Sequence, residues 1–418
     1  MKDSKTRYIV LGGLCASASL AYFVRNGVGS AESTIRADLG LSREESGLLI
    51  SSFFWPYAIC QIPAAMLAQR IGSRWALSLF VMLWSIATAG MSLGSAGLMS
   101  ASRAILGMAQ AGLVPVGLSV MVRWVPRSSQ ASASGAFSGF MSVGSIVAAP
   151  LTAWLVVNLG WRTMFVWYAL PGLLWAVWFV IWYRERPSLH PSVNEAERTL
   201  IEEGNGLVET AMETGVPWRI LLANPAMWFL CLQQFCRAAG YIFFASWFAT
   251  YLQEARGVTI LGSGWLTTVP LVADVAGCFF GGFLSDAILR RSINRRFARQ
   301  GLAFLALILC SGLIVMAWFV TDPIIAVLTI SAGMFCAAIA NPILAATVMN
   351  LGGAHVATFG AIVNMSGNLG AAAFPIVVPW LLANVGGWDA VLAGFAALYA
   401  VAAVFWILIR TKENLLEK

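Results

Sequence analysis

Long apolar stretches alternate with short polar segments along almost all of the 418 residues. Each stretch has about the 20 residues that a helix needs to cross a bilayer. A backbone in lipid must satisfy its own hydrogen bonds, and the ten-residue alternation of a membrane barrel is missing from this sequence. The pattern predicts an all-α integral membrane protein with twelve spans, at about residues 8–32, 46–69, 75–95, 98–122, 132–158, 163–183, 225–251, 261–285, 300–320, 323–348, 356–383 and 388–409.

One long hydrophilic segment, residues 184–222, interrupts this pattern between the sixth and the seventh predicted span. It contains Pro187, Pro191 and several glutamates, among them those at positions 195, 197, 202, 203, 209 and 213. We interpret it as a solvent-exposed cytoplasmic linker with one short amphipathic helix. It divides the chain into an N-terminal half, residues 1–183, and a C-terminal half, residues 223–418, each with six predicted helices.

The composition excludes a soluble protein and gives no indication of a cofactor. Hydrophobic residues make up 59% of the chain and charged residues 11%, whereas soluble domains contain about 25% charged residues. The seven cysteines all lie in apolar stretches without a C-x-x-C pair, so we interpret them as small hydrophobic residues and predict no metal. The 39 glycines fit closely packed membrane helices.

The basic residues predict the orientation of the chain. Most Lys and Arg residues fall at the two termini, in the linker and in alternate loops, and cytoplasmic loops collect these residues. We therefore expect a multi-pass protein of the cell (inner) membrane with both termini cytoplasmic. The net charge of +7 then reflects topology in the lipid bilayer, and we predict a monomer that binds no nucleic acid.

Arg25 is a charge inside the first predicted span, with no acidic residue within one helical turn. A charge at that depth costs at least a few kcal/mol unless it is compensated, so it marks a candidate functional site. The guanidinium fork matches a carboxylate or phosphate in two parallel hydrogen bonds. An anionic substrate is therefore one candidate partner for Arg25, and pairing with backbone carbonyls is the structural alternative.

Two loops at corresponding places in the halves, residues 65–74 and 282–291, contain similar motifs. They resemble the G-x-x-x-D-R-x-G-R-R signature of the major facilitator superfamily. The second copy keeps Gly282 and Asp286, and the first has Gln69 in the acidic position. The resemblance implies a twelve-helix transporter in which Arg70, Arg74 and Asp286 form a conformational latch. Ordinary cytoplasmic loop charge is the alternative interpretation of these arginines.

Within that superfamily the chain resembles the anion:cation symporter family, which includes sugar-acid and vesicular glutamate transporters. The resemblance runs through most of the chain, in residues 25–26, 51–57, 61–63, 84–85, 103, 160–162, 165, 235–237, 247, 250–252, 364, 367 and 368. It implies that Arg25 and Tyr57 bind an anionic substrate and that Arg237 is a second anion ligand. It also favours Asn364 as a pocket residue over a purely structural contact between helices.

Two departures from the family pattern concern proton coupling. Many members carry an acidic residue directly before the first-helix arginine, where this chain has Val24. They also carry a glutamate seven residues after the fourth-helix arginine, where this chain has Gln110. Neither side chain titrates, so proton symport by the usual residues is not expected. The fourth-helix arginine itself, Arg103, serves either a structural pairing or gating and anion attraction.

Arg237 and Asp274 fall at similar depths in the seventh and eighth predicted spans. One interpretation is a buried structural ion pair. In the others, Asp274 yields Arg237 to the substrate, titrates and supplies coupling, or faces a separate water-filled cavity. Tyr57 and Tyr241 are candidate hydroxyl donors to the substrate. Glu32, at the outer end of the first span, is interpreted as a solvated end residue.

These observations predict a secondary active transporter of a small organic anion that works by alternating access. The coupling cation is H⁺ or Na⁺ if there is one. The alternatives are a sodium-coupled carrier, a uniporter, an anion exchanger or a sensor on a transporter fold. A channel is disfavoured because polar residues are sparse in the spans. An enzyme is not expected, since the two histidines, His190 and His355, lie near predicted loops without catalytic partners.

Overall fold

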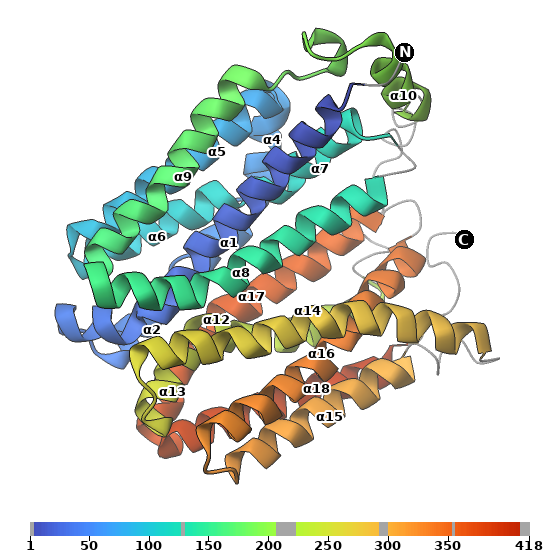
Figure 1. Cartoon of the computed structure of the whole chain (residues 1–418). Coiled ribbons are helices and arrows are strands. Elements are labelled where there is room, and N and C mark those ends of the chain that lie inside the picture. Colours follow the sequence, from blue (N-terminus) through green and yellow to red (C-terminus); the bar gives the residue numbers. More distant parts are fainter. Residues whose placement is uncertain (1–3, 127–129, 206–222, 292–299, 353–355, 410–418) are drawn as a thin grey trace. The chain divides into compact units, whose positions relative to one another are not determined.

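The computed structural model describes residues 4–126, 130–205, 223–291, 300–352 and 356–409, and every regular element within them is helical. The contacts divide the chain into two compact units. Unit 1 consists of Met1–Leu41 and Ser52–Glu213, and unit 2 of Ser42–Ser51 and Thr214–Lys418. The chain thus enters unit 2 for ten residues before it returns to unit 1. Each unit is described by itself (Figure 1).

The helices of unit 1 come from both sides of this excursion. They are α1 (Thr6–Leu39), α3 (Phe54–Ile59), α4 (Gln61–Ile71), α5 (Ser73–Gly90), α6 (Ala96–Gln110), α7 (Leu113–Trp124), α8 (Gln130–Leu159), α9 (Trp161–Trp182) and α10 (Glu195–Asn205). Short 3₁₀ turns at Met91–Leu93 and Pro187–Leu189 complete the unit.

The helices of unit 2 begin with α2 (Arg43–Ser51), the short segment that precedes the return to unit 1. The others are α12 (Pro225–Ser246), α13 (Phe248–Arg256), α14 (Ile260–Arg291), α15 (Leu302–Trp318), α16 (Pro323–Gly352), α17 (Val356–Leu381) and α18 (Gly387–Leu408). A π-helical turn, Leu382–Gly386, joins α17 to α18.

Each of the twelve ranges predicted as spans falls on helix, and three of them are broken. The second is split into α2, α3 and α4, with a bend of 56° between Arg43–Ile59 and Pro63–Ile71. The fourth breaks at Ala111 and Gly112, and the seventh at Trp247. By length and apolarity, eight described helical stretches qualify as spans, or nine with the bent pair. The count of twelve stays a prediction.

Prolines explain part of this segmentation. Pro56 and Pro63 stand in the second range, and Pro115 stands in the first turn of α7. A proline has no backbone N–H and clashes with the preceding turn, so it is tolerated at a helix start and bends a helix elsewhere. In a membrane such breaks require neighbouring helices that satisfy the released backbone groups.

Local signals fix several helix ends. Gly40 follows α1 in the left-handed conformation, with φ of 63°, and its N–H donates to the Arg36 carbonyl. Asn224 accepts a hydrogen bond from the Ala226 N–H at the start of α12, where Pro225 is the first helical residue. The start of α12 agrees with the predicted span at residue 225, whereas α1 ends at Leu39, beyond residue 32 where the predicted span ends.

Glycines allow close helix contacts in both units. In unit 1, α1 lies along α8, and a Cβ at Gly144 would collide with the Ser19 carbonyl. In unit 2, α14 lies along α16, and a Cβ at Gly277 would collide with the Phe335 carbonyl (Figure 1). Small residues at such crossings let two backbones approach, which is how membrane helices gain packing energy without a hydrophobic drive.

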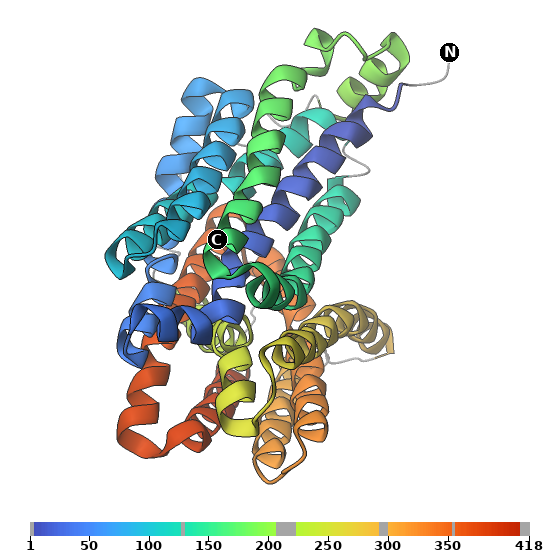
Figure 2. The same ribbon diagram turned by 60° about the vertical axis from the view of Figure 1, so that its left-hand side comes forward.

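The linker helix α10 packs against the start of α1 (Figure 2). Glu197 is fully buried there and accepts hydrogen bonds from the Thr6 and Arg7 N–H groups at 3.2 and 3.0 Å. It also pairs with Arg7 Nη1 at 3.2 Å. The prediction that this segment is solvent-exposed is wrong for Glu197, because the first turn of α1 has no acid of its own to satisfy its N–H groups.

Candidate functional site

The position of Arg25 is set by the packing of α1 against α8. Val24 is buried at 2% exposure, and the Asn26 amide donates to Ser145 Oγ of α8 at 3.0 Å. These neighbours fix the rotation of α1 about its own axis. The partly buried Arg25 side chain therefore points in a defined direction within unit 1.

Aromatic rings surround the Arg25 guanidinium. Its Cζ lies 4.4 Å from the ring centroids of both Phe53 and Tyr57, and 5.0 Å from that of Tyr22. Phe53 and Tyr57 stack on each other, with centroids 5.4 Å apart. A cation near aromatic faces gains roughly 0.5–2 kcal/mol per good contact. The ring faces thus stabilise the charge, and the Tyr57 hydroxyl also makes a hydrogen bond with the Arg25 side chain.

Two of the Arg25 N–H donors have no partner. Arg25 Nε and Nη2 are buried and make no hydrogen bond with any residue that the structure describes. None of the described ion pairs of unit 1 involves Arg25. A buried donor without an acceptor costs roughly 1–3 kcal/mol, and more when it is charged. The arrangement is therefore that of a preformed site for an anionic acceptor.

Arg103 approaches the same ring. It is 1% exposed, and its Cζ lies 5.7 Å from the Phe53 centroid. Gly107, one turn further along α6, allows the contact because a Cβ there would collide with the Phe53 carbonyl. We call Arg25, Phe53, Tyr57 and Arg103 the Arg25 cluster. Phe53 was part of the family resemblance, but no sequence pattern placed it beside both arginines.

Gln110 holds α6 to α1 beside this cluster. It is 3% exposed, and its Nε2 donates to the Ala21 carbonyl, one turn before Arg25, at 3.0 Å. A carboxylate in this position has no proton to donate and would face the carbonyl oxygen unfavourably. The glutamine therefore makes permanently the bond that a glutamate makes only when it is protonated.

Unit 2 supplies the remaining predicted ligands. Arg237 of α12 is partly buried, and its Nε donates to Gln234 Oε1 at 3.1 Å, one turn earlier. Tyr241 lies one turn after Arg237 and is also partly buried. Asn364 of α17 is exposed, and its carbonyl accepts a hydrogen bond from the Asn368 amide at 3.1 Å. No contact joins Asn364 to Arg237 among the described interactions.

Asp274 of α14 does not form the predicted ion pair with Arg237. No described ion pair joins the two residues, and the Arg237 Nε bonds Gln234 instead. Asp274 is partly exposed and makes no hydrogen bond within the described residues, but it lies near enough to Arg237 for the two opposite charges to interact. Of the interpretations left open by the sequence, the direct structural pair is therefore the one that the geometry does not contain.

A carboxylate from elsewhere in the chain caps the helix that begins within the first predicted latch motif. Glu185, which follows α9, accepts hydrogen bonds from the Ser73 and Arg74 N–H groups at 3.1 and 3.2 Å. It also pairs with Arg123. Glu185 thus caps the start of α5, and the sequence offered no motif that marked it. A carboxylate at a helix N-terminus is favoured by the helix dipole.

The latch arginines differ from each other. Arg74 Nε donates to the Val180 carbonyl at 2.7 Å, whereas Arg70 is exposed on α4. The side chain of Asp286 lies outside what the structure describes. The two copies of the motif therefore cannot be compared side chain by side chain, and the latch stays a prediction.

The prediction that Glu32 is a solvated end residue is wrong. Its side chain is 1% exposed, and Oε1 accepts a hydrogen bond from Arg36 Nε at 2.9 Å. The α1 helix continues to Leu39, so Glu32 stands more than a turn before its end. The helix extends beyond the predicted span because its last turns are amphipathic rather than apolar.

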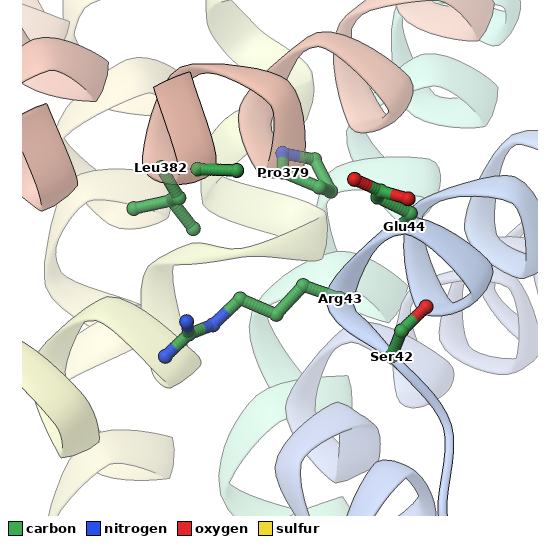
Figure 3. Close-up of a pocket in the computed structure, with 6 residues that line it drawn as sticks. Ser42, Arg43, Glu44, Pro379 and Leu382 are labelled. Atoms are coloured by element: carbon green, nitrogen blue, oxygen red, sulfur yellow. The ribbon is translucent and has the colours of Figure 1, made fainter. Parts of the chain in front are cut away.

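A pocket of about 250 Å³ lies at the start of α2, away from all predicted site residues. Figure 3 shows Arg43 extending from α2 beneath Pro379 and Leu382. Arg43 pairs with Glu254 at 2.8 Å, and Glu254 also accepts a hydrogen bond from Trp388 Nε1 at 3.2 Å. These contacts attach α2 to unit 2, and because the Arg43 charge is already paired they do not indicate a ligand.

Comparisons with known proteins place this geometry in context. The model of the Major Facilitator Superfamily matches residues 14–375 and 264–418. The chain is 28% identical over 402 residues to the probable sulfoacetate transporter SauU of Cupriavidus necator, covering 96% of this chain and 93% of that protein. It is 28% identical over 422 residues to the D-galactonate transporter of Escherichia coli, covering 98% and 96%.

The fold is similar to that of solved transporters. A bacterial homologue of the human lysosomal transporter Spinster, in an inward-facing and unoccupied conformation, aligns with a TM-score of 0.75 and 21% identity. The alignment covers 97% of this chain and 95% of that one. These relatives and this fold are those of transporters, not of enzymes.

Proposed function

Because the chain belongs to the Major Facilitator Superfamily, we propose that it is a secondary transporter that moves a small organic anion across the membrane by alternating access. It is a multi-pass membrane protein, for which we propose the cell inner membrane and cytoplasmic termini. The observation that carries the anion assignment is Arg25, whose buried Nε and Nη2 have no hydrogen-bond acceptor.

The Arg25 cluster suits a carboxylate or a sulfonate. A planar guanidinium with two unused N–H groups binds two oxygens of such a group at once. The Arg103 guanidinium, which also contacts the Phe53 ring, adds a second positive charge. Tyr57, stacked on Phe53, adds a phenol beside the guanidinium. The names of the relatives, with sulfoacetate and D-galactonate, agree with substrates of this chemistry.

We assign Arg237, Tyr241 and Asn364 to substrate binding from unit 2. The Arg237 Nε is held by Gln234, which leaves the Nη groups without a hydrogen bond among the described residues. Tyr241 lies one turn away on the same helix. This assignment rests on the family resemblance and on the Arg237 Nη groups. Arg70, Arg74 and Asp286 remain the proposed conformational latch.

Proton coupling through the two usual positions is not part of the proposal. Val24 is an apolar residue buried at 2% exposure, and Gln110 makes a hydrogen bond that does not depend on pH. Coupling therefore resides elsewhere, with Asp274 as the candidate, or the protein works as a uniporter or exchanger. Arg103 and Gln110 then act by position and charge rather than by titration.

The test is counterflow of labelled D-galactonate or sulfoacetate in liposomes that contain the purified protein. We expect exchange by the wild type and, for Arg25→Ala, a loss of about 30-fold or more, since truncating one partner of a buried charge pair costs roughly 2–5 kcal/mol. Arg162→Ala is the matched control, because Arg162 is exposed and pairs with Asp38 in the same unit.

The variants must elute as monodisperse, folded protein before their transport is compared. Unimpaired exchange by folded Arg25→Ala would contradict the assignment of the anion site. Binding of either anion without any exchange by the wild type would identify a sensor built on a transporter fold, and the transport proposal would fall.

A further inference from the structure

Asp274 is an acidic residue inside an apolar helix of unit 2. It stands near the middle of α14, within the stretch Ile260–Gly282 that qualifies as a membrane span. Three residues later, a Cβ on Gly277 would collide with the Phe335 carbonyl of α16, so this part of α14 packs closely and has little room to shift. A carboxylate at this depth is costly unless another group compensates its charge, which makes Asp274 a candidate functional residue.

Arg237 of α12 is the compensating group. It lies near enough to Asp274 for the two opposite charges to interact, and no second charge acts on Asp274 among the described residues. The interaction is not a direct contact, because no described ion pair joins the two side chains and Arg237 Nε donates to Gln234 Oε1 at 3.1 Å. Arg237 thus compensates the carboxylate without committing its remaining N–H groups to it.

The other groups beside Asp274 are neutral. Its charge also acts on two thiols and one phenol, which come from α14 itself, α15 and α18 and are Cys278, Cys310 and Tyr399. On α16, Cys336 is in turn near Cys310. None of these groups carries a positive charge, so none of them can replace Arg237 as the partner of the carboxylate.

The charged residues of α13 lie at the start of α14, away from Asp274. Gln253 Nε2 of α13 donates to Ser263 Oγ of α14 at 2.8 Å, about three turns before Asp274. At this end of the helix Glu254 and Arg256 have partners of their own. The pairing of Asp274 therefore depends on Arg237.

The Tyr399 hydroxyl is the donor whose role must be distinguished from that of Arg237. Tyr399 is 1% exposed, and its ring fills the space beside Gly240, which is about one turn after Arg237 on α12. Its hydroxyl donates to Met334 Sδ at 3.5 Å rather than to the carboxylate. A thioether is a weak acceptor, so a variant without this hydroxyl belongs in any test of Asp274.

We propose that the substrate anion competes with Asp274 for the Arg237 charge, and that Asp274 takes up a proton from water when the anion takes its place. The new O–H bond neutralises the carboxylate, so the charges balance in both states: Arg237 with Asp274 when the site is empty, and Arg237 with the anion when it is loaded. This coupling rests on the proposed transport function and on Arg237 as an anion ligand. It makes the protein a symporter of one proton with each anionic group bound at Arg237.

The coupling follows from the cost of an unpaired charge. Once the anion occupies Arg237, a carboxylate inside the membrane would lack its cation, and protonation removes that cost. By linkage, the proton favours the anion by the same factor by which the anion favours the proton. Na⁺ is a poorer substitute, because the neutral groups near Asp274 are thiols and a phenol, whereas Na⁺ is coordinated by carboxylate and carbonyl oxygens.

Proton uptake is measured by isothermal titration of the purified full-length protein with D-galactonate or sulfoacetate, in buffers of different ionisation enthalpy between pH 6 and 8. We expect the wild type to take up as much as about one proton per anion, and its apparent affinity to fall by up to about tenfold per pH unit as pH rises. Exchange at saturating anion should not follow pH, because the loaded, protonated protein changes conformation without releasing its proton.

Asp274→Asn keeps the size of the side chain and removes its charge. It should abolish proton uptake and bind the anion about fivefold or more tightly than the wild type at pH 7.5, since no carboxylate competes for Arg237. Asp322→Asn is the matched control. Asp322 is an exposed acid of unit 2 whose Oδ1 accepts hydrogen bonds from the Ile324 and Ile325 N–H groups, which an asparagine also accepts, so its proton uptake and affinity should equal those of the wild type.

Two further variants test the partners of Asp274. Arg237→Gln should bind the anion more weakly and without proton uptake, because Asp274 then carries its proton before the anion arrives. Tyr399→Phe, which removes only the hydroxyl, should take up protons as the wild type does. In liposomes, an inward proton gradient should drive accumulation of the anion by the wild type but not by Asp274→Asn, which should retain counterflow.

The outcomes separate this coupling from the transport proposal. Neither binding nor exchange by the wild type would contradict the proposed function, and the coupling with it. Exchange without proton uptake, or proton uptake that persists in folded Asp274→Asn, would overturn the coupling alone. Accumulation that follows Na⁺ rather than protons, or a loss of proton uptake in Tyr399→Phe with Asp274→Asn unaffected, would also overturn it.

Discussion

The two units each hold polar residues beside a close helix contact, but these residues differ in charge and in partners. In unit 1 the Arg25 cluster has two guanidinium groups around Phe53. In unit 2 the Asn341 amide donates to Cys278 and keeps a buried oxygen without a described donor, and Asp274 lies near the Arg237 charge. A glycine shortens the contact in both places, at Gly107 and at Gly277.

This difference suggests that the two units have different roles in transport. In unit 1 the buried Arg25 donors have no described acceptor, so they suit an anion, whereas in unit 2 the charges of Asp274 and Arg237 act on each other. In the family pattern that the sequence resembles, acidic residues near the first-helix arginine place anion binding and proton coupling in the same half of the protein. Val24 and Gln110 stand in the places of those acids here, so under the proposal unit 1 binds the anion and any coupling residue lies elsewhere.

The largest effect after loss of Arg25 is expected from Arg103→Met. Methionine keeps much of the volume but removes a charge that is 1% exposed beside Phe53. We expect anion exchange to fall about 30-fold, within the range of roughly 2–5 kcal/mol for truncated buried charges. The measurement is counterflow, with size-exclusion chromatography to verify folding.

Arg103→Lys sharpens this result. A lysine keeps the charge but not the planar fork, so it distinguishes anion attraction from a bidentate or stacked geometry. Full activity in folded Arg103→Met would contradict the idea that unit 1 needs two cations. Full activity in the lysine variant alone would show that the charge, and not the fork, matters.

A smaller effect is expected from Phe53→Leu. Leucine fills most of the space but removes the aromatic face that both guanidinium groups share, worth roughly 0.5–2 kcal/mol per contact. We expect the apparent affinity for the anion to fall about fivefold, as measured by the concentration dependence of exchange. Phe137→Leu is the matched control, because Phe137 is buried at 2% exposure and packs against Gly117 without an arginine.

Gln110→Glu tests whether a titratable residue at this position in unit 1 makes transport depend on protons. At neutral pH an ionised glutamate cannot donate to the Ala21 carbonyl, and protonation restores the donor. We expect exchange by the variant to be about threefold faster at pH 5.5 than at pH 7.5, with no comparable change in the wild type. A variant as insensitive to pH as the wild type would show that this α1–α6 hydrogen bond does not limit transport.

The helical architecture followed from the sequence because each span carries its own signal of length and apolarity. Arg25 and Asp274 stood out for a similar reason, since a charged residue in an apolar run is visible without any structure, whereas Gln110 stood out only through the family resemblance. The breaks in the second and fourth spans were less visible. They depend on prolines and glycines whose effect is decided by the neighbouring helices.

The partners of these residues could not be predicted in the same way. Phe53 lies between two arginines from distant segments, and Gln234 takes the hydrogen bond expected for Asp274. Glu197 and Glu185 looked like ordinary loop acids, yet each caps a helix in unit 1. Such pairings arise from tertiary contacts, about which a single sequence carries no periodic signal.

The smallest expected effect concerns His190, which lies outside the spans. Its effect on the pH dependence of stability must be separated from that of the Arg25 cluster and of Asp274. His190 is 5% exposed and packs against Trp124 and Trp182, and its Nδ1 accepts a hydrogen bond from the Ser192 N–H at 3.2 Å. Burial lowers its pKa, the Arg184 charge lowers it further, and Trp182 and Glu197 oppose the shift.

The sign of the resulting pH dependence follows from this lowered pKa. The unfolded chain binds the proton first, near the usual histidine pKa of about 6.5, so stability is full above that pH and declines as pH falls below it. We expect the Tm of the wild type to drop by no more than about 2 °C between pH 7.5 and 5.5 from this group. His190→Phe, which keeps a ring between the tryptophans, should flatten that slope, and an equal or steeper slope in the variant would assign the acid sensitivity to another group.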